Sequence, residues 1–203
     1  MAKKAYVYNG NAWEDLASSI SDLSSYATTV DLDDYQLKSV AGLTLINTTT
    51  FSAVTAVQVD NCFTSAYDNY RILLSITSCS GNNIAIRSRL VDGVTPDAGA
   101  AYGYLATGVQ NNGGANNLSL LSQTSWQFAH GALGNPIAAS IDVFAPNLAT
   151  QTRMTFNSMN FNGSFAFSYA GAGIGSSAEF EGIQFYPASG TFIGSMSIYG
   201  YGK

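Results

Sequence analysis

Residues 160–167 read NFNGSFAF, and this stretch decides the fold class of the chain. Aromatic residues alternate with small or polar residues on both sides of Asn162-Gly163. That dipeptide favours a type I′ turn, because Asn and Gly tolerate the positive φ angles which such a turn requires. Two alternating runs joined by this turn predict an antiparallel β-hairpin.

The same two-residue alternation recurs along the chain after Gly42, between segments rich in Gly, Asn, Asp and Pro. No amphipathic run of helical length follows that residue. The alternating runs are YRILLSIT (70–77), IAIRSRLV (84–91), RMTFNSMNF (153–161), FAFSY (165–169) and GTFIGSMSIYGYG (190–202). We therefore expect an all-β body over residues 43–203, built as an antiparallel β-sandwich or jelly roll.

The composition agrees with this class and narrows the choice of partners. Only 10% of the 203 residues are charged, 12% are aromatic, and the chain has 20 glycines. Six of its 13 acidic residues fall within residues 1–34, so the rest is nearly neutral. No cluster of Lys and Arg offers a footprint for phosphates, which argues against nucleic-acid binding. Such a surface suits neutral polar partners or other copies of the same chain.

Two further expectations concern the membrane and the cysteines. No apolar run approaches the roughly 18 residues of a membrane span, so we expect no membrane insertion. The start MAKKAYVYNGNAWEDL has no apolar core, so it is not expected to be a secretory signal. Cys62 and Cys79 are either two small buried side chains or a disulfide between neighbouring strands, and their spacing does not decide which.

The N-terminal segment, residues 1–42, has a different pattern. Apolar residues recur at spacings of 4, 3, 4, 3 and 7, with Asp34 at the skipped position, as in a heptad repeat. Ser, Thr and Asp weaken a helix here, so copies of the chain would have to bury the seam against one another. We expect a short, helical, coiled-coil-like oligomerisation segment; the alternative is an amphipathic helix lying on its own body. The seam residues are Leu16, Ile20, Leu23, Ala27, Val30 and Leu37.

The stretch YVYNGNAWEDL (6–16) followed by LSSYATTVDLDDYQLKS (23–39) resembles the N-terminal connector of bacteriophage virion appendages, especially tail-fibre and minor structural proteins. The segments CFTSAYDNYRILLSI (62–76) and GTFIGSMSIYGYGK (190–203) resemble the β-rich bodies of small phage virion proteins. The resemblance implies a homotrimer with a β-rich distal domain, located in the virion, assembled in the host cytoplasm and released by lysis. It carries over no catalytic residue.

Within this interpretation two groups of residues are candidates for contact with partners. Tyr6, Tyr8 and Trp13, in a short hairpin, are candidates for docking onto another virion protein, or they pack only on their own helix. Two segments with almost no charge, VDGVTPDAGAAYGY (91–104) and VQNNGGANNLSLLSQTSW (109–126), are expected to be loops that bind a host-surface glycan, or that pack between protomers or are inert. Their candidate ligand residues are Tyr102, Tyr104, Asn111, Asn112, Asn116, Asn117 and Trp126. Tyr199 and Tyr201 either pack on the last strand or contact a partner.

Nothing in the sequence predicts an enzyme or a cofactor. His130 is the single histidine, and it follows WQFA, an expected strand. Glu179 and Glu181 are expected on one face of a strand, where a solvated role is favoured over glycoside hydrolysis. Zinc and EF-hand ligand patterns are missing, so no metal is expected.

These observations together predict a structural protein of a phage virion. We expect a trimeric tail-fibre-type or receptor-binding appendage that acts by assembly and adhesion to the host surface. The alternative is a capsid decoration protein or head fibre that reinforces or ornaments the shell.

Overall fold

The fold is described from a computed structural model, for residues 6–8, 10–15, 42–81, 84–110, 115–131, 136–161 and 165–202. The chain divides into two compact units, Met1–Gly42 and Leu43–Lys203. In the first unit, β1 (Tyr6–Tyr8) and β2 (Trp13–Asp15) form an antiparallel hairpin in which Tyr8 lies opposite Trp13. The heptad seam, Leu16 to Leu37, falls outside the described residues, and its expected helix remains a prediction.

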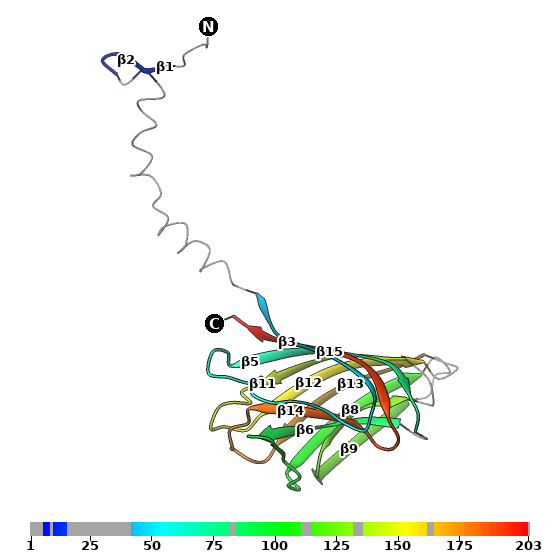
Figure 1. The fold of residues 1–203 in the computed structure, drawn as a ribbon. Helices are drawn as coiled ribbons and strands as arrows, with labels where there is room; N and C mark the ends of the chain where they lie inside the picture. Colours follow the sequence, from blue (N-terminus) through cyan, green and yellow to red (C-terminus); the bar gives the residue numbers. More distant parts are fainter. Residues whose placement is uncertain are drawn as a thin grey trace. The chain divides into compact units, whose positions relative to one another are not determined.

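The second unit, the body, consists of two antiparallel sheets (Figure 1). Between Leu43 and Gly202, no helix occurs among the described residues, so the expected all-β class is confirmed. The larger sheet has eight strands in the order β3 (Leu43–Val54), β15 (Phe192–Tyr201), β5 (Asn69–Cys79), β11 (Ile137–Phe144), β12 (Arg153–Phe161), β13 (Phe165–Ile174), β8 (Tyr102–Gln110) and β9 (Ala115–Gln123). The smaller sheet has the order β10 (Trp126–Gly131), β6 (Ile84–Asp92), β14 (Gly182–Pro187) and β4 (Val57–Val59), with β7 (Thr95–Pro96) paired to β6.

Each of the five alternating runs forms a strand, in β5, β6, β12, β13 and β15. The hairpin expected from NFNGSFAF is present as the β12–β13 pair, in which Phe161 lies opposite Phe165. The turn type expected for Asn162-Gly163 falls outside the described residues and stays a prediction.

The core lies between the two sheets and follows the alternation. In β5 the side chains of Tyr70, Ile72, Leu74 and Ile76 are buried, while the residues between them point away from the core. The smaller sheet contributes its own buried residues to the same cluster, among them Ile86, Leu90, Ile183 and Phe185. A β-sandwich fits this arrangement, since the inner faces of two sheets share one hydrophobic core.

The segment that precedes β5 shows how local sequence fixes one end of the body. The Tyr70 hydroxyl donates a hydrogen bond to the Thr64 carbonyl at 2.7 Å and accepts one from the Thr64 amide at 2.6 Å. The Tyr67 ring covers Gly200 of β15 so closely that a Cβ there would overlap the ring. These contacts tie the 62–70 segment to the last strand, and they explain why an aromatic-rich stretch precedes β5.

Both cysteines, Cys62 and Cys79, are buried and free, which leaves no disulfide between them. Burial raises the pKa of both thiols, that of Cys62 to about 12. The described part of the chain includes no helix with the length and apolar character needed to cross a membrane.

Candidate functional site

The surface that stands out is the side of the eight-stranded sheet that faces away from the core, which we call the outer face. Its side chains come from the alternate positions that the strand period leaves outside. Most of the exposed large apolar side chains of the body project from it: Leu43, Leu45, Leu73, Leu105, Leu121, Met159, Phe167 and Tyr169. Among its described residues the charged ones are Arg71, Asp142 and Arg153.

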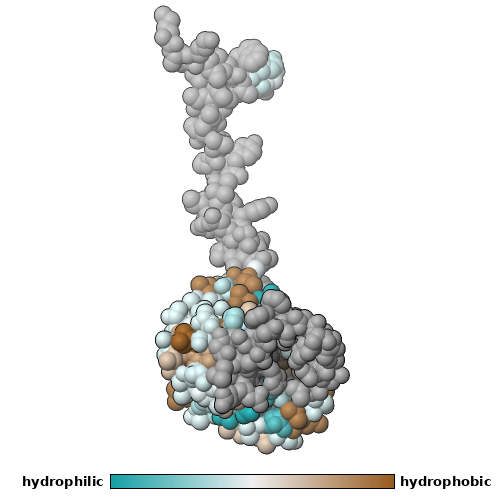
Figure 2. Space-filling view, turned by 90° about the vertical axis from the view of Figure 1, so that its right-hand side faces the viewer, coloured by the Kyte–Doolittle hydropathy of each residue, from teal (hydrophilic) through white to brown (hydrophobic). Residues whose placement is uncertain are grey.

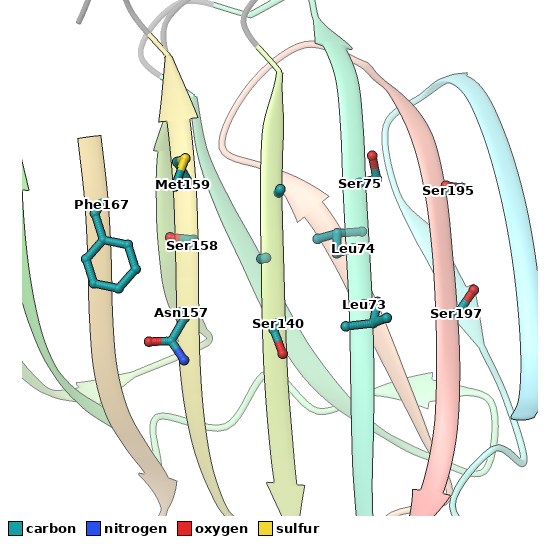
Figure 3. Close-up of a pocket in the computed structure, with 12 residues that line it drawn as sticks. Leu73, Leu74, Ser75, Ser140, Asn157, Ser158, Met159, Phe167, Ser195 and Ser197 are labelled. Atoms are coloured by element: carbon teal, nitrogen blue, oxygen red, sulfur yellow. The ribbon is translucent and has the colours of Figure 1, made fainter. Parts of the chain in front are cut away.

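An open groove of about 460 Å³ crosses the centre of this face, and we call it the serine groove. Figure 3 shows Phe167 of β13 and Met159 of β12 on one side, and Ser195 and Ser197 of β15 on the other. No lining residue carries a charge. The full lining is Leu73, Leu74, Ser75, Ala138, Ala139, Ser140, Asn157, Ser158, Met159, Phe167, Ser195 and Ser197.

The register of the strands explains why the groove is hollow. Ser195, Ser75 and Ala138 lie side by side across β15, β5 and β11, so three small side chains form one row of its floor. The same row continues through Met159 to Phe167, whose larger side chains form the wall. The groove therefore results from a change in side-chain size along a cross-strand row.

Two leucines near the β9 edge of the larger sheet protrude from the outer face. Leu105 of β8 is 64% exposed and Leu121 of β9 is 76% exposed. Leu105 is flanked across the ladders by Gly171 and Ser119, and Leu121 lies over Gly103. Because their neighbours are so small, these side chains stand above the sheet; we call Leu105 and Leu121 the apolar knob.

A polar cluster lies beside the groove, on the row that Arg71 and Asp142 share. The Arg71 guanidinium donates two hydrogen bonds to the Asp142 carboxylate, from Nε and Nη2, each at 2.8 Å. The Tyr201 hydroxyl donates to the same carboxylate at 2.6 Å. Partial burial by itself would raise the pKa of Asp142, but the hydrogen bonds from Arg71 and Tyr201 outweigh it and hold that pKa below its usual value.

The outward side of the smaller sheet is different in character. It presents Arg87 and Arg89 of β6 next to Gln184 and Tyr186 of β14. The Arg89 guanidinium lies 5.0 Å from the centre of the Tyr186 ring, and Gln184 donates to Gln58 at 3.0 Å. This side is polar, whereas the outer face of the larger sheet bears most of the exposed large apolar side chains of the body. The side of the molecule shown in Figure 2 bears brown and white areas with only small teal ones, as expected for a body with few charges.

The structure corrects the expectation that Tyr102, Tyr104 and Trp126 bind a ligand from loops. All three lie in strands, and their side chains are at most 4% exposed, in the core between the sheets. Trp126 packs edge-on against Tyr102, and its indole Nε1 donates to the Gly173 carbonyl at 3.0 Å. The error arose because runs rich in Gly, Asn and Ala resemble loops, although here they pair along most of β8 and β9.

The other predicted contact residues are placed only in part. Asn116 and Asn117 belong to β9, opposite Gly108 and Thr107, but their side chains fall outside the described residues, as do Asn111 and Asn112 altogether. In the N-terminal hairpin Tyr8 is exposed; the side chains of Tyr6 and Trp13 are not described. Their docking role stays a prediction.

The structure places the residues considered for catalysis at different elements of the body. Glu179 and Glu181 are exposed, and they precede β14 instead of sharing a strand face as expected. His130 lies in β10, the expected strand, opposite Ala85. Among the described residues no three His, Cys, Asp or Glu side chains gather in a way that would hold a metal ion.

Comparison of the chain with protein-family models, with curated proteins and with solved structures gives no match. The function is therefore argued from the outer face itself. Sequence reasoning missed the serine groove and the apolar knob. The alternation of β5 and β12 already marks Leu73 and Met159 as facing away from the core, but it does not reveal which strands lie next to them.

Proposed function

We propose that this chain is a structural protein of a bacteriophage particle, a homo-oligomeric appendage that acts by assembly and by contact with the host surface. The single observation that carries the proposal is the outer face of the eight-stranded sheet, where eight large apolar side chains are exposed beside few charges. The resemblance of residues 6–39 to phage connector segments supplies the setting, and a trimer is the oligomer that this resemblance implies.

The physical argument rests on the cost of such a face in water. Apolar side chains that gather on one exposed surface mark sites of association. The outer face spans eight strands at about 4.8 Å spacing and roughly nine residues of about 3.4 Å rise, so its area is on the order of 1,000 Å². A stable protein interface needs about 800 Å² on each partner, so this face is large enough to be one.

The finer parts of the architecture belong to the same proposal. We assign the body to the β-sandwich or jelly-roll class, which its two antiparallel sheets support. Residues 16–37 form the helical oligomerisation segment, and the β1–β2 hairpin with Tyr6, Tyr8 and Trp13 docks onto another virion protein. The function needs no cofactor, nucleic acid or membrane insertion.

The first experiment is sedimentation equilibrium of the purified full chain over a hundredfold range of concentration. We expect a mass near three times the 21.4 kDa of one chain. A monomer throughout that range would contradict the proposal. Because a trimer fits both a tail appendage and a head protein, this experiment tests assembly but not location.

Location needs a second experiment, gold-conjugated antibody labelling of intact particles with electron microscopy. Gold at the tail tip, together with saturable binding of the purified chain to host cells, is the expected result. Gold spread over the head, without cell binding, would replace the adhesion role with capsid decoration. Absence of gold from purified particles would contradict the assignment to the virion.

A further inference from the structure

We infer that the apolar knob of one copy seats in the serine groove of the next copy, so that the outer face is the interface between the bodies of the oligomer. This inference rests on the proposed function and deepens it, because it names the surfaces that meet. Both features lie on the same face, and among the described residues neither is covered by another part of its own chain.

The knob needs an apolar environment that its own sheet does not offer. Leu105 and Leu121 are the two most exposed of the large apolar residues on the outer face. They come from neighbouring strands, and the small residues Gly103 and Gly171 beside them leave their side chains uncovered. Burying them removes apolar surface from water, which favours association.

The groove can accept them without an electrostatic penalty. An apolar side chain that covers a charge leaves it without water, which is costly. The lining has no charge, and the nearest charged side chains, Arg71 and Asp142, already bind each other. Leu73, Met159 and Phe167 make part of the lining apolar, and the volume of about 460 Å³ holds more than one aliphatic side chain.

The knob cannot fill the groove of its own copy. β8 lies three strands from β11 at the centre of the groove, about 14 Å along the sheet at the usual strand spacing. The contact must therefore join two copies. A knob and a groove at different places on one surface make a heterologous contact, which closes into a trimeric ring when the rotation from copy to copy is one third of a full turn with no shift along the axis.

The decisive experiment is disulfide trapping in the full chain that carries Leu121→Cys together with Ser140→Cys. Under mild oxidation we expect covalent oligomers on a non-reducing gel, at a yield at least tenfold above that of the matched control, Val94→Cys with Ser140→Cys. Val94 is 73% exposed but lies between β6 and β7 of the smaller sheet. Equal yields from the two variants would overturn the inference.

A second variant tests the energetics. Leu121→Asp should raise the dissociation constant of the oligomer at least tenfold, while Val94→Asp, an equally drastic change elsewhere, should leave it within twofold. Near-ultraviolet circular dichroism verifies that each variant folds. If Leu121→Asp does not fold, disulfide trapping with Leu121→Cys and Ser140→Cys still tests the inference. An unchanged dissociation constant in a folded Leu121→Asp chain would contradict the inference.

The failures of the two proposals are distinguishable. A native oligomer that neither cross-links through residues 121 and 140 nor responds to Leu121→Asp contradicts the knob and groove but leaves the oligomeric appendage standing. A monomeric native chain contradicts both. If the chain binds a neutral oligosaccharide such as maltoheptaose, and Ser140→Trp abolishes that binding without changing the oligomer, the groove is a glycan site and the inference is wrong.

Discussion

Arg71 and Asp142 are direct cross-strand neighbours on β5 and β11, and their side chains meet in a two-point ion pair with both N···O distances at 2.8 Å. The pair is partly exposed, with 35% of the Arg71 side chain and 20% of the Asp142 side chain accessible. Tyr201 of β15, which lies on the other side of β5 from β11, donates a third hydrogen bond to the Asp142 carboxylate. The cluster thus ties together three strands of the larger sheet.

Replacing the arginine of this pair should have a modest cost. We expect Arg71→Met to lower the free energy of unfolding by about 1 kcal/mol, because exposed ion pairs are weak but two-point hydrogen bonds to a carboxylate are stronger than most. Urea denaturation measures the change as a lower midpoint at constant slope. Arg153→Met, the same substitution at an exposed position of the same face, serves as the control and should change the midpoint little.

The same cluster predicts a pH dependence. The pKa of Asp142 is lower in the folded chain than in the unfolded chain, so its contribution to stability is fully present above about pH 4 and is lost as the pH falls through the folded pKa. The difference in unfolding free energy between the native chain and Asp142→Asn should therefore shrink as the pH falls below about 4 and through the folded pKa. A difference that stays constant over that range would show that the carboxylate charge is not involved.

Tyr102 should behave as a structural residue and not as a ligand contact. Its buried hydroxyl accepts a hydrogen bond from the Leu90 amide at 3.1 Å and donates one to the Asp97 carbonyl at 3.2 Å. We expect Tyr102→Phe to cost about 1–2 kcal/mol, since both backbone groups lose a partner. The control is Tyr169→Phe on the outer face, where the ring is half exposed; thermal unfolding should separate the two variants clearly.

The thiols give a prediction that needs no substitution. The thiolate is the reactive form of cysteine, and burial raises the pKa of Cys62 to about 12 and that of Cys79 above its usual value. With a disulfide reagent at pH 8, the native chain should show almost no reactive thiol, and the unfolded chain should show two. Rapid reaction of a native thiol would mean that the region around Val59 or Thr191, beside these cysteines, opens readily.

The fold was predictable where the side-chain period was regular. β5 alternates regularly, so its position and its buried face follow from the sequence, whereas in β12 Ser158 and Asn160 are buried and Met159 is exposed. β8 and β9 do not alternate regularly, because Gly103, Gly108, Asn116 and Asn117 interrupt the pattern. They are strands because β8 pairs with β13 and β9 pairs with β8. Local propensity yields to tertiary pairing at such positions.

The candidate site was out of reach for a different reason. The groove joins Ser75, Ala138 and Ser195, which are separated by more than 50 residues in the chain and become neighbours only through the strand order. A period of two tells which residues share a face, but it does not tell which strands are adjacent. The exposure of Leu105 and Leu121 in the apolar knob was unpredictable for the same reason, because it depends on the small residues that lie beside them on the neighbouring strands.

The position of β15 between β3 and β5 has a consequence for how the protein is made. The ribosome synthesises β3 and β5 long before β15, so the edges that β15 will pair stay open until β15 emerges. Any product that stops short of residue 192 would keep two bare strand edges, and such edges promote aggregation.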